Sequence, residues 1–161
     1  QLTSIDEMSK EHGLGAFHAP NFTIGAILLQ KIAALAAPYF HYVDIFEEHH
    51  EAKLDSPSGT ALAIAKSIRD AAPDDLKTNV PPRENVPGSR GANYKGINIH
   101  SSRLPGRMAH HQVTFGGLGQ TLTIRHDTIN RECYMPGVLL GIRKVLLLEG
   151  LVIGLDKLLE L

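Results

Sequence analysis

The segment from residue 47 to residue 61 gathers the side chains best suited to chemistry. It reads Glu47-Glu48-His49-His50-Glu51-Ala52-Lys53-Leu54-Asp55-Ser56-Pro57-Ser58-Gly59-Thr60-Ala61. A histidine, His49 or His50, can exchange a proton near neutral pH, and Lys53 can supply a positive charge or a proton. Together these groups suit the reduction of an anionic, imine-like substrate.

The same segment runs into the start of a predicted helix, for which Ser58 is a suitable N-terminal cap. Small or apolar residues then recur at the helical period: Ala61, Leu62, Ala65, Ile68 and Ala72. The free backbone N–H groups and the dipole at such a helix start favour an anion. Gly59 lets a ligand approach the backbone and Thr60 adds a hydroxyl donor, so we expect a substrate carboxylate to bind there.

Two elements should bring this segment to its place. After a polar opening, residues 14–19 predict a short buried strand that ends at Pro20, and a helical stripe follows from Ile24 until Pro38. Residues 39–46 are rich in aromatic and β-branched side chains, which is typical of a strand. The charged cluster that begins at Glu47 is therefore expected at the end of a strand.

The middle of the chain predicts a sheet. Residues 73–96 are dense in Pro, Gly, Asn and charge, which indicates a long surface loop. Three β-like runs come next, at 97–103, 111–115 and 120–126. A glycine-rich turn at 116–119 joins the last two runs, so we expect a largely antiparallel sheet.

The end of the chain predicts helices. Apolar residues recur at a helical period from Met135 to Leu146, Pro136 fits a first turn, and Gly150 is a suitable stop. A short helix is expected within residues 151–161. The resulting fold class is α+β, with a mixed, mainly antiparallel sheet and helices on one face.

Composition narrows the class of protein. The 161 residues are 43% hydrophobic, which is enough to bury the core of one ordinary domain. Lysine plus arginine (16) nearly balances aspartate plus glutamate (17), which argues against a nucleic acid or an anionic membrane as partner. No apolar run approaches the roughly 20 residues of a membrane-spanning helix, and the single cysteine, Cys133, excludes an internal disulfide. The expected location is the cytoplasm.

Other interpretations of the 47–61 segment stay open on the residues alone. A pair of histidines before a serine-capped helix can be ordinary surface polarity. A metal site is a further alternative, in which the pairs at 49–50 and 110–111 converge with Glu47 or Glu48. The chain has no H-x-x-x-H or C-x-x-C spacing, so we predict no metal site.

The segment also resembles the signature of a known family. The pattern Glu47-x-His49-His50-x-x-Lys53-x-Asp55-x-Pro57-Ser58-Gly59-Thr60-Ala61 is similar to that of the dihydrodipicolinate reductases. Further stretches are similar to the family's junction between domains and to its later strands and closing helix: His18-Ala19-Pro20-Asn21-Phe22, Thr23-Ile24-Gly25, residues 120–126, Asn130-Arg131 and Met135-Pro136-Gly137. The resemblance covers most of the chain.

The resemblance implies hydride transfer from NADH or NADPH to a cyclic, unsaturated dicarboxylate, which yields tetrahydrodipicolinate for lysine and diaminopimelate biosynthesis. It implies that His49 transfers a proton and that Lys53 is a proton donor or charge partner. His50, Gly59 and Thr60 would bind the substrate. The residues that would touch the nicotinamide end of the cofactor are Ala19, Pro20, Asn21 and Phe22, with Arg131 and Tyr134 as weaker candidates.

The family also implies a homotetramer built by the sheet and a division of the chain into three parts. Residues 1–20 would be a remnant of a nucleotide-binding domain with the junction, residues 21–130 the substrate-binding and tetramerisation domain, and residues 131–161 helices that return toward the nucleotide-binding domain. The strand, glycine-rich turn and helix that bind a pyrophosphate have no counterpart here. We therefore expect this chain alone to bind a dinucleotide weakly and to turn over little substrate.

A second class of function is a non-catalytic relative that binds a dicarboxylate or serves in assembly. The presence of His49, His50 and Lys53 together favours the enzyme. A metal-dependent hydrolase is a third alternative, which a stoichiometric bound zinc ion would identify. The choice between NADH and NADPH lies in the region of the family that this chain lacks.

Overall fold

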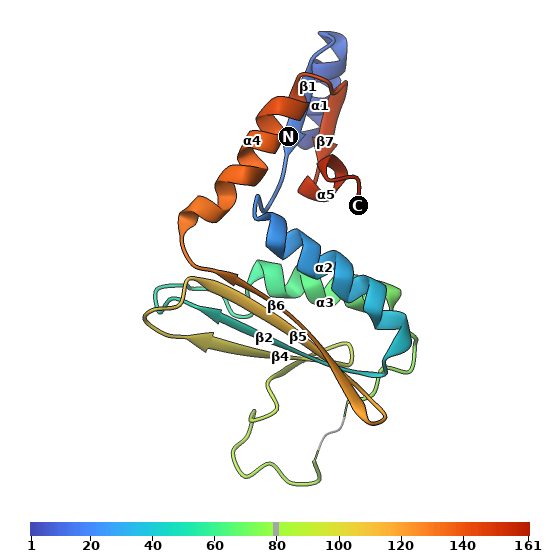
Figure 1. Ribbon diagram of the computed structural model, residues 1–161, viewed down its shortest axis with the longest axis vertical. Coiled ribbons are helices and arrows are strands. Elements are labelled where there is room, and N and C mark those ends of the chain that lie inside the picture. Colours follow the sequence, from blue (N-terminus) through green and yellow to red (C-terminus); the bar gives the residue numbers. More distant parts are fainter. Residues whose placement is uncertain (79–80) are drawn as a thin grey trace. The chain divides into compact units, whose positions relative to one another are not determined.

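The computed structural model describes residues 1–78 and 81–161 (Figure 1). The chain forms two compact units. Unit 1 contains residues Gln1–Ile27 and Asn130–Leu161, and unit 2 contains residues Leu28–Ile129. The 47–61 segment lies entirely in unit 2.

Unit 2 is built on a five-stranded sheet. Its strands are β2 (Tyr42–His49), β3 (Ala92–Tyr94), β4 (Ile97–Arg103), β5 (Ala109–Gly117) and β6 (Gln120–Thr128), in the spatial order β3-β4-β2-β5-β6. Only the β2–β4 pair is parallel, and the other three pairs in this described sheet are antiparallel. The prediction of a mixed, mainly antiparallel sheet is confirmed.

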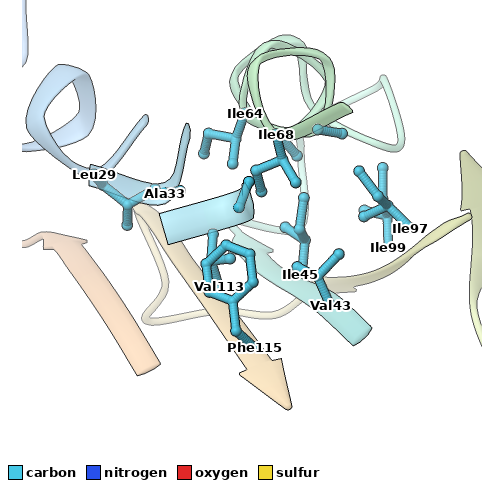
Figure 2. Packing of buried hydrophobic residues seen from close by; sticks show 13 residues of the cluster. Leu29, Ala33, Val43, Ile45, Ile64, Ile68, Ile97, Ile99, Val113 and Phe115 are labelled. Carbon is cyan, nitrogen blue, oxygen red and sulfur yellow. The ribbon is translucent and has the colours of Figure 1, made fainter. Parts of the chain in front are cut away.

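Two helices cover one face of this sheet (Figure 1). They are α2 (Ile24–Ala36) and α3 (Gly59–Ala71). A short 3-10 helix that contains Pro38, η1 (Ala37–Tyr39), follows α2. The core between helices and sheet consists of apolar side chains from both layers (Figure 2): Leu29 and Ala33 of α2, Ile64 and Ile68 of α3, and Val43, Ile45, Ile97, Ile99, Val113 and Phe115 of the strands. The predicted placement of the helices on one face is thus confirmed.

Strand β2 alternates between the buried face and the open face of the sheet. Val43 and Ile45 are buried against the helices, whereas Tyr42 and Phe46 point to the open face. The prediction that the strand ends before Glu47 is wrong, because β2 continues to His49. Strand β2 pairs with β4 on one side and with β5 on the other. The backbone hydrogen bonds on both sides extend β2 through residues with poor strand propensity.

The predicted hairpin and loop are largely confirmed. β5 and β6 are joined at Leu118-Gly119, and Gly119 has a φ of +70°, which favours glycine. The described part of the 73–96 loop contains one element that we did not predict, β3, which pairs with β4. Lys95 and Gly96 between them both have positive φ, which fits a two-residue hairpin turn.

Unit 1 contains α1 (Leu2–Glu11), β1 (Gly15–His18), a 3-10 helix η2 (Arg131–Tyr134), α4 (Met135–Val145), β7 (Gly150–Ile153) and α5 (Leu155–Leu158). The predicted first strand and the long closing helix are confirmed. The short helix expected within residues 151–161 is α5, whereas helix α1 and strand β7 were not predicted. The run Leu151-Val152-Ile153 is a strand because it pairs in parallel with β1, a partner far away in sequence. No helix of the described residues is long and apolar enough to cross a membrane.

Candidate active site

A cluster of polar side chains is buried on the helix-covered face of the unit 2 sheet. It consists of Glu47, His49, His111 and Ser58, whose exposed fractions are 1%, 7%, 4% and 2%. Glu47 and His49 continue the alternation of Ile45, and His111 lies opposite Glu47 in the antiparallel β2–β5 pair. The polar cluster is therefore a continuation of the apolar core toward the end of β2.

The carboxylate of Glu47 is the centre of this cluster. Its Oε2 atom accepts a hydrogen bond from Nδ1 of His49, and its Oε1 atom accepts one from Nη2 of Arg103 at 2.9 Å. Burial alone raises the pKa of Glu47, but hydrogen bonds from His49, Arg103 and Ser101 outweigh it and lower the pKa to about 2. Glu47 is therefore a carboxylate at any pH at which the protein works.

The His49 ring is fixed on one side and free on the other. Nδ1 is bound to Glu47, and the ring of His111 lies edge-on at a centroid distance of 5.3 Å. Within the described residues, Nε2 of His49 has no hydrogen-bond partner. Nε2 is therefore the atom at which this histidine can exchange a proton with a ligand.

His111 connects the cluster to the start of α3. Its Nε2 atom lies 3.3 Å from Oγ of Ser58, which in turn accepts a hydrogen bond from the backbone N–H of Ala61 at 3.1 Å. This geometry confirms the predicted cap. Burial, reinforced by the nearby His49, lowers the pKa of His111 to about 4, so the ring is neutral in the folded protein.

The neutral His111 makes folding stability depend on pH. Between pH 6.5 and pH 4 the unfolded chain binds a proton at this residue that the folded chain does not bind. We expect the free energy of unfolding to fall by about 3 kcal/mol from this residue as the pH drops through that window. Urea unfolding at several pH values measures it. This pH-dependent loss of stability should be absent in His111→Gln. It should be unchanged in His110→Gln, which alters a histidine on the open face of the sheet. An equal loss in His111→Gln would contradict the assignment of the effect to His111.

A second cluster surrounds the first turn of α3. Nζ of Lys53 donates to Oδ1 of Asp55 at 2.6 Å, and this bond, with smaller contributions from the backbone N–H groups of Asp55 and Gly59, lowers the pKa of Asp55. A carboxylate thus lies beside the helix start, whose free N–H groups favour an anion. Within the described residues, the N–H of Thr60 has no acceptor.

Arg103 joins the two clusters. The same guanidinium that binds Glu47 donates from Nη2 to the backbone carbonyl of Asp55 at 2.6 Å. The loop that carries Lys53 is thereby attached to the strand end that carries His49. The structure therefore connects two of the predicted site residues, His49 and Lys53, through one hydrogen-bonded network. Two more, Gly59 and Thr60, form the start of the helix that follows the same loop.

Two other predicted site residues of this region, Gly59 and His50, are exposed to solvent. A side chain added at Gly59 would meet nothing within 4 Å, so the glycine leaves free space at the helix start. His50 is exposed and makes no hydrogen bond through its side chain to another described residue. The structure does not bring His50 into the buried cluster.

The predicted cofactor-contacting residues lie in unit 1, in the segment that follows β1. Oδ1 of Asn21 accepts a hydrogen bond from the N–H of Thr23 at 2.8 Å, just before α2 begins. The ring of Phe22 packs edge-on against the ring of Phe17, at a centroid distance of 5.9 Å. The segment begins at the carboxyl end of β1 in a parallel pair, the usual position of ligands in α/β sheets. Of the weaker candidates, Arg131 and Tyr134 form the ends of η2.

Glu47, His49 and His111 also bring three donor atoms within 4.8 Å of one another. Both carboxylate oxygens of Glu47 are already engaged, by His49 and by the cationic Arg103, so we interpret the group as a hydrogen-bonded network. The convergence that the metal alternative required is thus formed in part, by Glu47, His49 and His111, but among the described residues His110 and Glu48 do not join it. His110 binds Asp127, and Glu48 binds Arg107, on the open face.

Three residues of the site escaped the sequence reasoning: Arg103, His111 in its buried role, and Glu47 as partner of a histidine. The alternation of Val43 and Ile45 could have placed Glu47 and His49 on the core face. Nothing local in the sequence identifies Arg103, because its contacts depend on the parallel pairing of β2 with β4.

Comparison with known proteins agrees with the resemblance in the motif. The family model described as "Dihydrodipicolinate reductase, C-terminus" matches residues 25–159. Curated proteins named 4-hydroxy-tetrahydrodipicolinate reductase are 50% identical in Carboxydothermus hydrogenoformans, over 99% of this chain, and 47% identical in Dehalococcoides mccartyi, over all of it. In both cases the chain spans 60% of the relative's length.

A solved structure is also similar, that of dipicolinate-bound dihydrodipicolinate reductase from Paenisporosarcina sp. TG-14. It matches with a TM-score of 0.87 and 47% sequence identity, over 97% of this chain and 59% of that one. The family model covers most of the chain, and the relatives match nearly all of it at about half identity. The chain therefore belongs to the family of the dihydrodipicolinate reductase C-terminus.

Proposed function

We propose that this chain is the substrate-binding and catalytic part of a 4-hydroxy-tetrahydrodipicolinate reductase, which produces tetrahydrodipicolinate for lysine and diaminopimelate biosynthesis in the cytoplasm. The observation that carries the proposal is that Arg103 joins Glu47, the partner of His49, to the loop that leads into the start of α3. The names of the relatives support the reaction.

One carboxylate of the substrate would bind at the start of α3. The N–H and hydroxyl of Thr60 are available donors, Gly59 leaves room, and Lys53 supplies a positive charge. The carboxylate of Asp55 already accepts a hydrogen bond from Lys53 beside this helix start. The exposed His50 would contribute from the edge of the site. Dipicolinate, bound in the similar Paenisporosarcina reductase, is a dicarboxylate of this type.

His49 would supply the proton that completes the reduction. A bound NADPH or NADH would provide a hydride, and its addition to a conjugated ring builds negative charge on the substrate. An acid or a cation placed beside that charge stabilises it. Nε2 of His49 would donate the proton, and Lys53 would hold the substrate carboxylate or stabilise the charge.

The residues of unit 1 fit the nicotinamide end of the cofactor. Ala19, Pro20, Asn21 and Phe22 follow the carboxyl end of β1, where a ligand can contact backbone groups. No glycine-rich phosphate turn is present in the sequence, so unit 1 would be the returning part of a larger nucleotide-binding domain. The chain alone would then bind a dinucleotide weakly.

We also propose that copies assemble into a homotetramer through the open face of the unit 2 sheet. Tyr42 and Phe46 are each 38% exposed on that face. Two strands away from β2 the sheet ends in β6, an edge strand of nine residues whose outer side can pair with another strand. Light scattering of the purified chain should give a molar mass four times that of one chain.

The activity is tested on a reductase that combines this chain with a nucleotide-binding domain. Consumption of NADPH or NADH is followed by absorbance in the presence of 4-hydroxy-tetrahydrodipicolinate, and the ratio of the two rates identifies the preferred cofactor. We expect consumption that depends on the dicarboxylate. A folded reductase that oxidises neither cofactor with this substrate would refute the proposal.

A further inference from the structure

Two donors of different character face the two oxygens of the Glu47 carboxylate, which also accepts from Ser101. One oxygen faces the imidazole Nδ1 of His49 and the other faces Nη2 of Arg103 at 2.9 Å. We infer that Glu47, held by Arg103, is a positioning residue that keeps the proton of His49 on Nδ1 and leaves Nε2 as the atom that exchanges a proton with the substrate.

The first step of the argument concerns Arg103. A guanidinium carries only donors and stays charged, so the atom of residue 47 that faces it must be an acceptor. Arg103 is itself anchored, since it donates to the carbonyl oxygens of Ser102 at 2.7 Å and Asp55 at 2.6 Å. Two bonds besides the one to Glu47 therefore set its orientation.

The second step concerns the other oxygen. An ionised carboxylate is an acceptor at both oxygens, so the Nδ1 atom of His49 must donate to it. A neutral histidine has one donor and one acceptor nitrogen. With Nδ1 as the donor, the unbonded Nε2 atom is the acceptor in the neutral ring and the acid in the protonated ring.

The consequence for the reaction rests on the proposed function. When protonated His49 gives up its Nε2 proton, the neutral ring that remains is already the tautomer that Glu47 binds. The Nδ1 hydrogen bond is therefore kept before and after the transfer, and no ring rotation is needed. In serine proteases, the comparable amide substitution of a carboxylate that orients a histidine lowers kcat by about 10⁴ through the wrong tautomer.

Glu47→Gln tests this arrangement because glutamine has one acceptor and one donor end. Its oxygen is expected to face Arg103, so its N–H would face Nδ1 of His49 and move the proton of the neutral ring to Nε2. In the reductase with its nucleotide-binding domain we expect kcat to fall by at least about 100-fold, with little change in the substrate KM.

The matched control is Glu48→Gln, which removes the same charge one residue away. Glu48 points to the open face and binds Arg107 at 2.7 Å, so this variant should keep both kcat and the His49 tautomer. The pair Glu47→Gln with Arg103→Met should restore the tautomer and part of kcat, because the amide can then turn its oxygen to His49. If Glu47 had a purely structural role, the opposite would be expected: the double variant would have a lower kcat than either single variant.

The tautomer is read directly from ¹⁵N NMR of histidine-labelled 161-residue chain, with His49 assigned by its loss in His49→Gln. We expect Nδ1 to carry the proton in the wild type and Nε2 to carry it in Glu47→Gln. A wild-type ring protonated on Nε2 overturns the inference even if the variant does not fold, as does an unchanged tautomer in a folded Glu47→Gln. Correct tautomers in a protein without reductase activity would instead refute only the proposed function.

Discussion

Replacing His49 by glutamine is expected to lower kcat of the reductase by about 10²–10⁴-fold, the usual contribution of a general acid. The amide of glutamine can still donate to Glu47, so the buried network and the fold should persist. What the variant loses is the titratable Nε2 atom, which has no hydrogen-bond partner among the described residues.

Steady-state kinetics of the reductase, with the cofactor saturating, measures this loss. His110→Gln is the matched control, because it makes the same change at a histidine that binds Asp127 on the open face of the sheet. It should retain wild-type kcat. A His49→Gln variant within a few fold of the wild type would show that another group supplies the proton.

Lys53→Met is expected to weaken dicarboxylate binding by about 10- to 100-fold. This corresponds to the free energy that a hydrogen bond to a charged group contributes. Methionine keeps much of the length of the side chain but removes the charge. It also leaves the carboxylate of Asp55 without its bond of 2.6 Å, so an anion at the helix start would then meet an unneutralised negative charge.

Calorimetric titration with dipicolinate measures this effect without the cofactor. Lys66→Met is the control, because Lys66 is an exposed lysine on α3 whose loss changes the net charge equally. It should bind dipicolinate as the wild type does. Equal affinity in both variants would remove Lys53 from the binding site.

The sequence predicted the parts of the fold that local patterns determine. The amphipathic stripe after Ser58 is α3, and the glycines near residue 118 form the β5–β6 turn. The errors in the predicted secondary structure lie where pairing with a strand distant in sequence determines the conformation. Glu47 and His49 are in a strand because β4 and β5 pair with β2 on both sides, and residues 150–153 form a strand because β1 lies beside them.

The residues of the candidate site likewise divide into those that a local pattern predicted and those that depend on distant strands. His49, Lys53, Gly59 and Thr60 were found because they occur within twelve residues of one another, in a pattern that suits an anionic substrate. Arg103 and His111 were not, because each reaches the site from another strand. Their contribution depends on register: His49 lies opposite Arg103, and Glu47 lies opposite His111.

The measurement that tests the account most directly is an NMR titration of the ¹⁵N-labelled 161-residue chain with dipicolinate. We predict saturable shifts that centre on the amides of Gly59 and Thr60 and on the ring of His49, and their loss in the Lys53→Met variant. Saturable binding whose shifts are confined to the open face of the sheet, with Gly59, Thr60 and His49 unchanged, would contradict the placement of the dicarboxylate site.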